Sequence, residues 1–223
     1  MNQYYAQKLS AERLELCYEL APPRVKKYLE AEIDFVVEKI KDNDMVLELG
    51  CGYGRIFPKL LKKAGTVLGI DNSFSSLKYA KEKFQTEDSV YLFQMDAVNP
   101  GFKDHQFDAV VCIQNGISAF KVNQQKLVEE AIRVTRKGGQ VFFSSYFEKF
   151  WNHRMEWFQI QSKHNLIGEI DYDKTGNGVI ICKDGFKAVT VTKDDFISLT
   201  LNTGIVPEIV EVDDSSIFCV LKV

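Results

Sequence analysis

Short apolar runs alternate with amphipathic stretches through the middle of the chain. The runs suit buried strands, and the stretches between them repeat apolar residues at three- and four-residue steps, as helices do. Strands and helices in this order form βαβ units, with a largely parallel sheet and right-handed crossovers. The sequence therefore predicts a doubly wound α/β core. Its expected strands are 45–49, 66–70, 90–94, 107–113 and 140–145, and its expected helices are 56–64, 74–84 and 122–135.

Helical segments precede this core. Loose periodicity ends at Pro22-Pro23, and a second helix is expected from Arg24 to Ile40 because its apolar residues recur at helical spacing. We expect one domain that divides into four parts. These are an N-terminal helical cap (1–40), the core (41–146), a helix and β-hairpin insert (147–192), and a closing helix with two strands (193–223).

The last third of the chain departs from the core's rhythm. Segments 166–172, 178–182 and 187–191 resemble short strands joined by turn residues, so a β-hairpin or meander is expected there. Thr192, with Asp195 three residues later, predicts the N-cap of a helix that ends before Gly204. Segments 206–212 and 217–223 are then expected to be antiparallel neighbours.

Charge and composition exclude several classes of protein. The 28 basic and 31 acidic residues leave a formal net charge of -3, so there is no chain-wide positive field to hold nucleic acid. The N-terminus lacks the continuous apolar core of a signal peptide, and no later run approaches the ~18 apolar residues of a membrane span. The five cysteines are scattered and include no C-x-x-C pair, which argues against a disulfide framework or a zinc site. We expect a cytoplasmic protein without a metal, and no oligomeric state is indicated.

The segment from Val46 to Arg55 reads V-L-E-L-G-C-G-Y-G-R, a strand that runs into three alternate glycines and then a helix. Glycine permits positive φ and a close approach of the backbone to a ligand. A dinucleotide fingerprint would read G-x-G-x-x-G, but here the third glycine comes one residue early and Arg55 stands in its place. The pattern predicts a ligand-binding turn without naming the ligand.

Polar residues also end the next three strands. Asp71 with Asn72 follows the second strand, Asp96 with Ala97 the third, and Gln114 the fourth. Ligands of open α/β sheets bind outside the carboxyl ends of the strands, so these loops should face one crevice. Each acid also has a simpler interpretation: Glu48 as a helix-dipole partner, Asp71 as the N-cap of the helix near Ser73, and Asp96 as a turn residue.

The motifs E-L-G-C-G-Y-G, G-I-D-N-S, F-Q-M-D-A and R-K-G-G-Q-V-F-F resemble the successive motifs of class I S-adenosylmethionine-dependent methyltransferases. The resemblance covers about 41–146 and implies a Rossmann-like, seven-stranded sheet whose last strand is antiparallel. It implies S-adenosylmethionine as cofactor, with Asp71 on the ribose, Asp96 and Ala97 on the adenine, and Gln114 below the sulfonium. The methionine half would lie against Glu48, Gly50, Gly52 and Gly54, and Cys51 and Asn72 are further cofactor-binding candidates.

The loop after the fourth strand, Q-N-G-I-S, lacks the Asn/Asp-Pro-Pro-aromatic signature of enzymes that methylate nucleic-acid bases. It is loosely similar to loops of small-molecule enzymes related to glycine N-methyltransferases, whose fold also carries an antiparallel insert after the fifth strand. We therefore expect transfer of a methyl group to a small-molecule acceptor. A protein or RNA acceptor, or a non-catalytic cofactor-binding protein, is the alternative.

Two segments are candidates for the acceptor pocket. Helical spacing after residue 146 places Trp151 and Arg154 on one face with aromatic residues, where the arginine could clamp a carboxylate, lie over a ring or snorkel at the helix edge. The N-terminal segment, with Tyr4, Tyr5, Arg24 and Tyr28, could close as a lid or merely cover a sheet edge. No catalytic residue is assigned. The substrate candidates are Tyr5, Tyr28, Asn115, Tyr146, Trp151 and Arg154.

Overall fold

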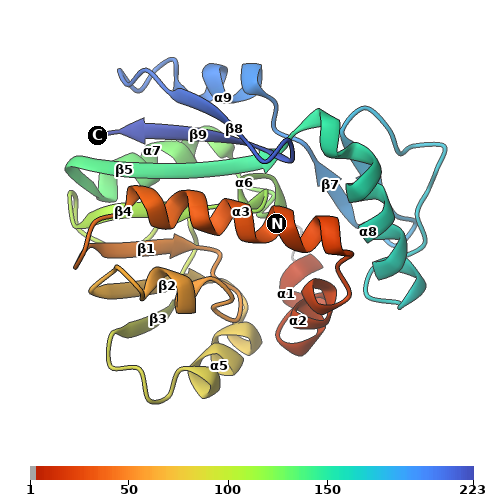
Figure 1. Ribbon diagram of the computed structural model, residues 1–223, viewed down its shortest axis with the longest axis horizontal. Helices are drawn as coiled ribbons and strands as arrows, with labels where there is room; N and C mark the ends of the chain where they lie inside the picture. Colours follow the sequence, from red (N-terminus) through yellow and green to blue (C-terminus); the bar gives the residue numbers. More distant parts are fainter. Residues whose placement is uncertain (1–3) are drawn as a thin grey trace.

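The computed structural model describes residues 4–223, and within them seven strands form one sheet in the order β3-β2-β1-β4-β5-β9-β8 (Figure 1). The pairs from β3 to β5 are parallel, whereas β9 is antiparallel to both of its neighbours. The predicted doubly wound fold with an antiparallel last strand is confirmed. The strands are Met45–Leu49 (β1), Thr66–Asp71 (β2), Val90–Gln94 (β3), Phe107–Cys112 (β4), Thr135–Tyr146 (β5), Glu208–Val212 (β8) and Ser216–Lys222 (β9).

Helices cover both faces of this sheet, with α3 across the front in Figure 1 and α7 behind. Side chains alternate along each buried strand and so supply both layers: in β4, Ala109 and Val111 pack toward α3, while Val110 and Cys112 pack toward α7. One layer contains α3 (Pro23–Lys39), α4 (Phe57–Leu60) and α5 (Phe74–Lys83). The other contains α6 (Gly116–Ala119), α7 (Gln124–Val134) and α9 (Lys193–Thr200).

A third hydrophobic cluster joins the N-terminal helices to the insert at one end of the sheet. It includes Cys17, Tyr28, Trp157, Phe158 and Phe186, all buried. The elements around it are α1 (Tyr4–Lys8), α2 (Glu12–Glu19), η1 (Glu148–Phe150), α8 (Trp151–Lys163), β6 (Val179–Ile181) and β7 (Lys187–Val189).

The structure corrects the predicted insert. β6 and β7 form an antiparallel hairpin, but the expected strand at 166–172 does not form; Ile170 makes an isolated bridge to Cys182. Leu166 and Ile167 are adjacent and both buried, which the alternating sides of a half-buried strand do not allow. This apolar run therefore packs into the cluster as irregular chain.

The helix expected at 56–64 is also shorter than predicted and spans only Phe57–Leu60. Beyond it, Lys62 N–H donates to Lys59 O and Lys63 N–H to Leu60 O, the three-residue spacing of tighter turns. The N-cap at Thr192 is confirmed, with Thr192 and Asp195 bonded reciprocally. Along residues 4–223, no helix combines the length and apolarity needed to cross a bilayer.

Candidate functional site

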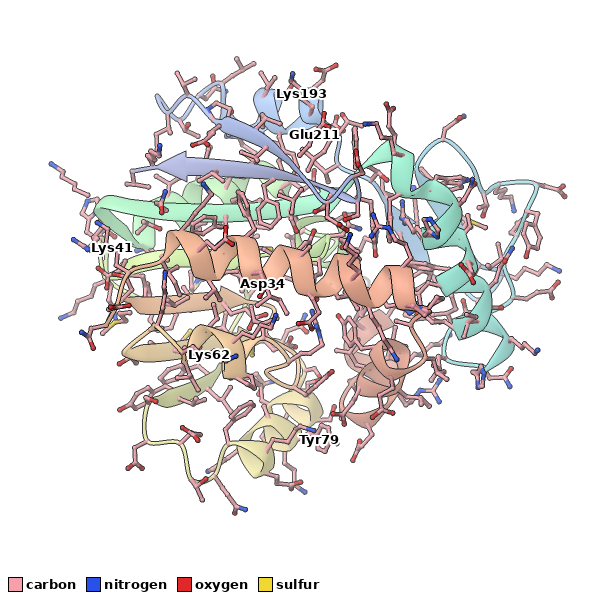
Figure 2. The ribbon with its side chains drawn as sticks, viewed as in Figure 1. Asp34, Lys41, Lys62, Tyr79, Lys193 and Glu211 are labelled. Atoms are coloured by element: carbon pink, nitrogen blue, oxygen red, sulfur yellow. The ribbon has the colours of Figure 1, made fainter. Side chains whose placement is uncertain are left out.

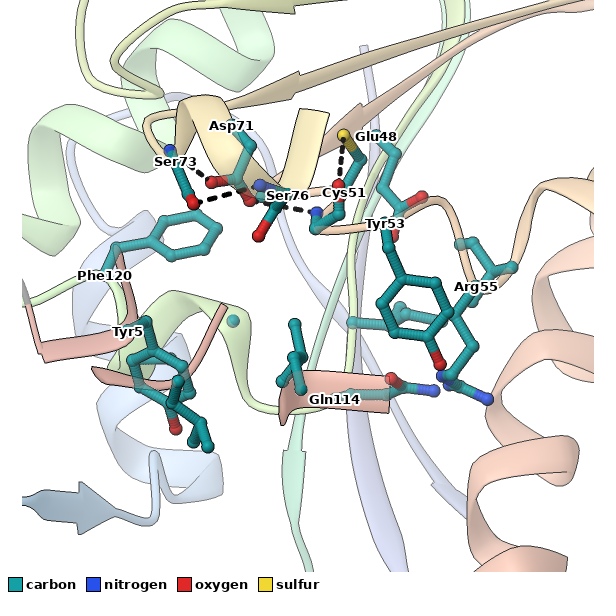
Figure 3. A pocket seen from close by; sticks show the side chains of 18 of the residues that line it. Tyr5, Glu48, Cys51, Tyr53, Arg55, Asp71, Ser73, Ser76, Gln114 and Phe120 are labelled. Carbon is teal, nitrogen blue, oxygen red and sulfur yellow. Dashed lines mark hydrogen bonds between the residues drawn. The ribbon is translucent and has the colours of Figure 1, made fainter. Parts of the chain in front are cut away.

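A cavity lies at the carboxyl ends of the parallel strands, where ligands of open α/β sheets bind (Figure 3). The loops after β1, β2, β3 and β4 all contribute to its wall. The predicted convergence of these loops on one crevice is therefore seen in the structure. The predicted cofactor residues in the wall are Glu48, Gly50, Cys51, Gly52, Asp71, Asn72, Asp96, Ala97 and Gln114.

Glycine is required at positions 50 and 54 for different reasons. Their φ angles are 71° and 78°, in the region that side chains rarely adopt. A Cβ on Gly50 would collide with the ring of Phe120, which itself lines the cavity. A Cβ on Gly54 would lie 2.7 Å from Phe84 Cε2 and 2.8 Å from Phe57 Cδ2. Gly54 therefore serves packing beneath the loop and is not among the residues that line the cavity.

Asp71 joins the glycine loop to the turn before α5. Its Oδ2 accepts the Gly52 N–H at 2.9 Å, and its Oδ1 accepts the Ser73 N–H at 2.7 Å (Figure 3). The N-cap of α5 is Ser73, whose hydroxyl accepts the Ser76 N–H, so Asp71 itself is not the cap. Burial raises the pKa of the Asp71 carboxyl, while the backbone donors oppose that shift. Each oxygen retains a second lone pair for a ligand hydroxyl.

A charged corner of the wall holds buried polar atoms that lack hydrogen-bond partners within the described chain. They are Glu48 Oε2, Arg55 Nε and Nη2, and Gln114 Nε2. Figure 3 shows Arg55 and Gln114 directed toward the same part of the pocket. Burial raises the pKa of Glu48 well above its usual value, and the positive charge of Arg55 opposes this. A zwitterionic ligand would satisfy this corner, because it offers both an anion and a cation.

Arg55 is a site residue that the sequence interpretation did not select. Its guanidinium carbon lies 4.5 Å from the ring centroid of Tyr18, which also lines the cavity. The signal was present in the sequence, because Arg55 occupies the position where a dinucleotide fingerprint needs glycine. In the sequence, Arg55 argued only against a dinucleotide-binding site.

Glu32 is a second acid that the sequence interpretation missed. It lies on the buried side of α3 with no exposed surface, whereas Asp34 projects from the outer side (Figure 2). Glu32 Oε2 accepts the Gln114 N–H at 2.8 Å, and Ser144 Oγ accepts the same N–H at 2.7 Å. Gln114 and Asn115 have φ angles of 57° and 61°, so these bonds hold a strained loop directly after β4.

The N-terminal helices form the roof of the cavity. Leu14 Cδ2 lies 3.1 Å from the position of a Cβ on Gly52, so α2 touches the glycine loop. Ala11 N–H donates to Ser76 Oγ at 3.1 Å, which joins the turn between α1 and α2 to α5. Glu15 on α2 accepts bonds from Tyr79 and Lys83 of α5. The N-terminal helices therefore contact both the glycine loop and α5.

Aromatic rings from four separate segments line the other end of the cavity. Among the predicted acceptor residues, Tyr5, Tyr28 and Tyr146 lie in this wall, and the ring centroids of Tyr28 and Tyr146 are 5.5 Å apart. Trp157 and Phe158 of α8 complete it. Burial raises the pKa of each of the three tyrosines, so their hydroxyls stay protonated at neutral pH.

The other three predicted acceptor residues lie outside the cavity wall. Asn115 is buried behind it and accepts a bond from Ser145 Oγ at 2.9 Å. Trp151 is half-buried at the start of α8. Arg154 is completely buried, which overturns its alternative interpretation as a snorkelling side chain at the helix edge.

Cys51 and Cys112 act as packing residues in this site. Both are buried, and burial raises the pKa of both thiols, which disfavours the nucleophilic thiolate. Within residues 4–223, no three His, Cys, Asp or Glu side chains gather closely enough to hold a metal ion.

Comparison with known proteins agrees with this geometry. A family profile described as "Methyltransferase domain" matches residues 46–139, from β1 into β5. The phosphatidylethanolamine N-methyltransferase of Cereibacter sphaeroides is 36% identical over 107 residues, which are 47% of this chain and 51% of that protein. The match thus spans about half the length of this curated relative.

Solved structures share the fold across nearly the whole chain. A SAM-dependent methyltransferase from Aquifex aeolicus superposes with a TM-score of 0.62 and 17% identity, covering 93% of this chain and 96% of that one. N-methyltransferase NodS from Bradyrhizobium japonicum WM9, solved in complex with S-adenosyl-l-homocysteine, gives a TM-score of 0.60 and 12% identity. It covers 90% of this chain and 87% of its own. At these identities the likeness concerns the fold.

Proposed function

We propose that the chain is a class I S-adenosylmethionine-dependent methyltransferase that methylates a small-molecule acceptor. The methyltransferase-domain match to residues 46–139 and the fold shared with solved methyltransferases support this proposal. The observation that carries the proposal is the cavity under α1 and α2, whose wall combines unpartnered charged and polar atoms with a group of aromatic rings. A cavity closed by α2 suits a small acceptor better than an extended polymer.

The buried orphan atoms fit the cofactor. We assign the ribose hydroxyls to Asp71, with Asn72 beside them, and the adenine to the loop of Asp96 and Ala97. The α-carboxylate of the methionine part suits Arg55, and its ammonium suits Glu48. Gly50, Cys51 and Gly52 provide the close backbone surface along it.

When bound, S-adenosylmethionine supplies a methyl group already activated on a sulfonium. What the chain must add is alignment, and orientation of two reactants can be worth ~7–11 kcal/mol. The Gln114 N–H is held by Glu32 and Ser144, which fixes Gln114 in the cavity wall. The roof of α1 and α2 excludes water from the reacting groups.

The aromatic end is the proposed acceptor side. Tyr5, Tyr28 and Tyr146 come from three different elements, so the acceptor would lie where the cap, α3 and β5 meet. The relative from Cereibacter sphaeroides is named for a lipid acceptor rather than a protein or nucleic acid. This supports the small-molecule class without naming the substrate.

Labelled cofactor distinguishes the acceptor classes. The purified chain is incubated with an extract of its own cells and S-adenosylmethionine labelled in the methyl group. Enzyme-dependent label in the small-molecule fraction is the expected result. Label confined to protein or RNA would contradict the proposed acceptor, and no transfer to either fraction, although the cofactor binds, would favour a non-catalytic role.

A further inference from the structure

Arg154 carries a positive charge into the interior without an acidic partner in the described chain. It is on α8, has no exposed surface, and is among the largest fully buried side chains. Burying an unpaired charge is costly, so such a residue generally has a compensating partner. Burial lowers the pKa of Arg154, and the opposing influences come from tyrosines rather than carboxylates.

Only one side of the guanidinium group is anchored. Nη1 donates to Gly178 O at 3.0 Å and to Thr190 Oγ1 at 2.8 Å, so the two ends of the inserted hairpin fix its position. Nε and Nη2 are buried and have no partner among residues 4–223. These two nitrogens form one edge of the guanidinium plane, whose parallel N–H groups match the two oxygens of a carboxylate or phosphate.

The guanidinium group lies against rings of the aromatic end of the cavity, although Arg154 is not itself a wall residue. The guanidinium carbon lies 4.2 Å from the ring centroid of Tyr146 and 5.6 Å from that of Phe158, and both rings line the cavity. The Tyr28 hydroxyl, another cavity residue, is also buried without a partner in the described part of the chain. Arginine and tyrosine thus leave unsatisfied donors in the same region.

Two lysines add positive charge near Arg154. Lys121 follows α6 and is half-buried, and burial together with the charges of Lys187 and Arg154 lowers its pKa to about 8. Cations that disfavour one another in this way make the region favourable for an anion.

We propose that the acceptor of this chain carries an oxyanion, either a carboxylate or a phosphate, which the Nε and Nη2 edge of Arg154 binds. The inference rests on the proposed function, because it places this acceptor beside the cofactor. The aromatic rings hold the apolar part of the acceptor, and the hairpin holds the arginine. The insert after β5 therefore determines substrate class.

Model anions test the site without knowledge of the natural acceptor. Benzoate, phenyl phosphate and benzamide are titrated into the S-adenosylhomocysteine-loaded chain. We expect benzoate or phenyl phosphate to bind at least about tenfold more tightly than benzamide, because only the anions can make charge-assisted bonds. Selective binding of one anion identifies the carboxylate or the phosphate as the source. Equal binding of all three, or no binding of either anion, overturns the proposal.

Variants test whether Arg154 causes the preference for anions over benzamide. Arg154→Met should lower the affinity for the preferred anion by about ten- to a hundredfold. Arg154→Lys keeps a charge but loses the paired donors, so it should lower this affinity by about tenfold. Lys163→Met is the matched control for an exposed cation on the same helix and should change affinity much less. Unchanged anion affinity in folded Arg154→Met or Arg154→Lys overturns the proposal.

Cofactor binding distinguishes failure of the proposed function from failure of the anion site. An unchanged S-adenosylhomocysteine affinity in each variant shows that its fold is intact. If Arg154→Met does not fold, the anion affinity of Arg154→Lys and the anion selectivity of the wild type test the proposal. A wild-type chain that binds no S-adenosylhomocysteine contradicts the proposed function itself. A chain that binds it but does not discriminate between benzoate or phenyl phosphate and benzamide contradicts only the anion site.

Discussion

At the scale of single residues, the charged corner and the Asp71 turn should contribute to different parts of the cofactor. Arg55 and Glu48 are assigned to the amino-acid part, and Asp71 to the ribose. 5′-Methylthioadenosine contains the ribose but lacks the amino-acid part, so it separates the two contributions. Ligand pairs of this kind test each residue against an internal control.

We predict that Arg55→Ala weakens S-adenosylhomocysteine binding by ~1.5–3 kcal/mol, which is the usual contribution of a hydrogen bond to a charged group. The affinity for 5′-methylthioadenosine should stay unchanged. Asp71→Ala should weaken both ligands, because it removes the ribose acceptor and releases the Gly52 N–H. Calorimetry with both ligands measures this. An equal loss for the two ligands in Arg55→Ala would refute its assignment.

Glu32 should make stability depend on pH. Burial raises its pKa from 4.5 to about 7, so the folded chain binds this proton more tightly than the unfolded chain does. The contribution of Glu32 to stability therefore falls as pH rises from about 4.5 through about 7. The 2.5-unit difference, 7 minus 4.5, corresponds to about 3 kcal/mol.

Glu32→Gln removes this titration but retains an oxygen that can accept the Gln114 N–H. The free energy of unfolding of the wild type relative to the variant should thus decrease across that range by up to about 3 kcal/mol. Urea denaturation of both proteins at several pH values measures the difference. A difference that does not vary with pH would show that the pKa of Glu32 is the same in the folded and unfolded chains.

At the scale of elements, the roof is the part whose contacts should govern ligand exchange. Glu15 joins α2 to α5 through Tyr79 and Lys83, and the Glu15 and Lys83 side chains are 23% and 37% exposed. Partly exposed pairs contribute ~0.2–1 kcal/mol, so their loss changes rates modestly.

Glu15→Gln should accelerate both association and dissociation of S-adenosylhomocysteine by about two- to fivefold, because the roof opens more readily. Stopped-flow measurements of both rates test this. Glu19→Gln, an exposed residue on the same helix, is the control and should leave them unchanged. If the rates of Glu15→Gln match the wild type, opening of α2 does not limit exchange.

The α9 cap should affect stability without affecting the site. Thr192→Ala removes a capping box and should lower the free energy of unfolding by ~1 kcal/mol. S-adenosylhomocysteine affinity should not change, because the cap lies outside the cavity wall. Urea denaturation and calorimetry measure the two effects, with the exposed Lys193→Ala as the control. A variant as stable as the wild type would mean that the cap contributes nothing to the free energy of unfolding.

At the scale of the whole molecule, local periodicity predicted the fold core well. The helices α5 and α7 each bury one face, and β1, β2 and β4 are short apolar runs buried on both faces, so both patterns are visible in the sequence. The segment 166–172 was predicted wrongly because its apolar residues are buried by tertiary packing rather than by a sheet.

The site was predictable where it follows the strand ends and less so where distant segments meet. Asp71 and Asp96 follow strands directly, so topology placed them in the crevice. The burial of Arg154 depends on Gly178 and Thr190, which are 24 and 36 residues away in the chain. Glu32 left a weak signal, as a carboxylate among the apolar positions of α3.

The central claim is that the cavity binds S-adenosylmethionine through Asp71 and the glycine loop. Calorimetric titration of S-adenosylhomocysteine into the wild-type chain and into Asp71→Ala tests it most directly. We expect one site per chain in the wild type and binding weakened by ~1.5–3 kcal/mol in the variant. No binding by the folded wild type, or equal affinity in the two proteins, would contradict it.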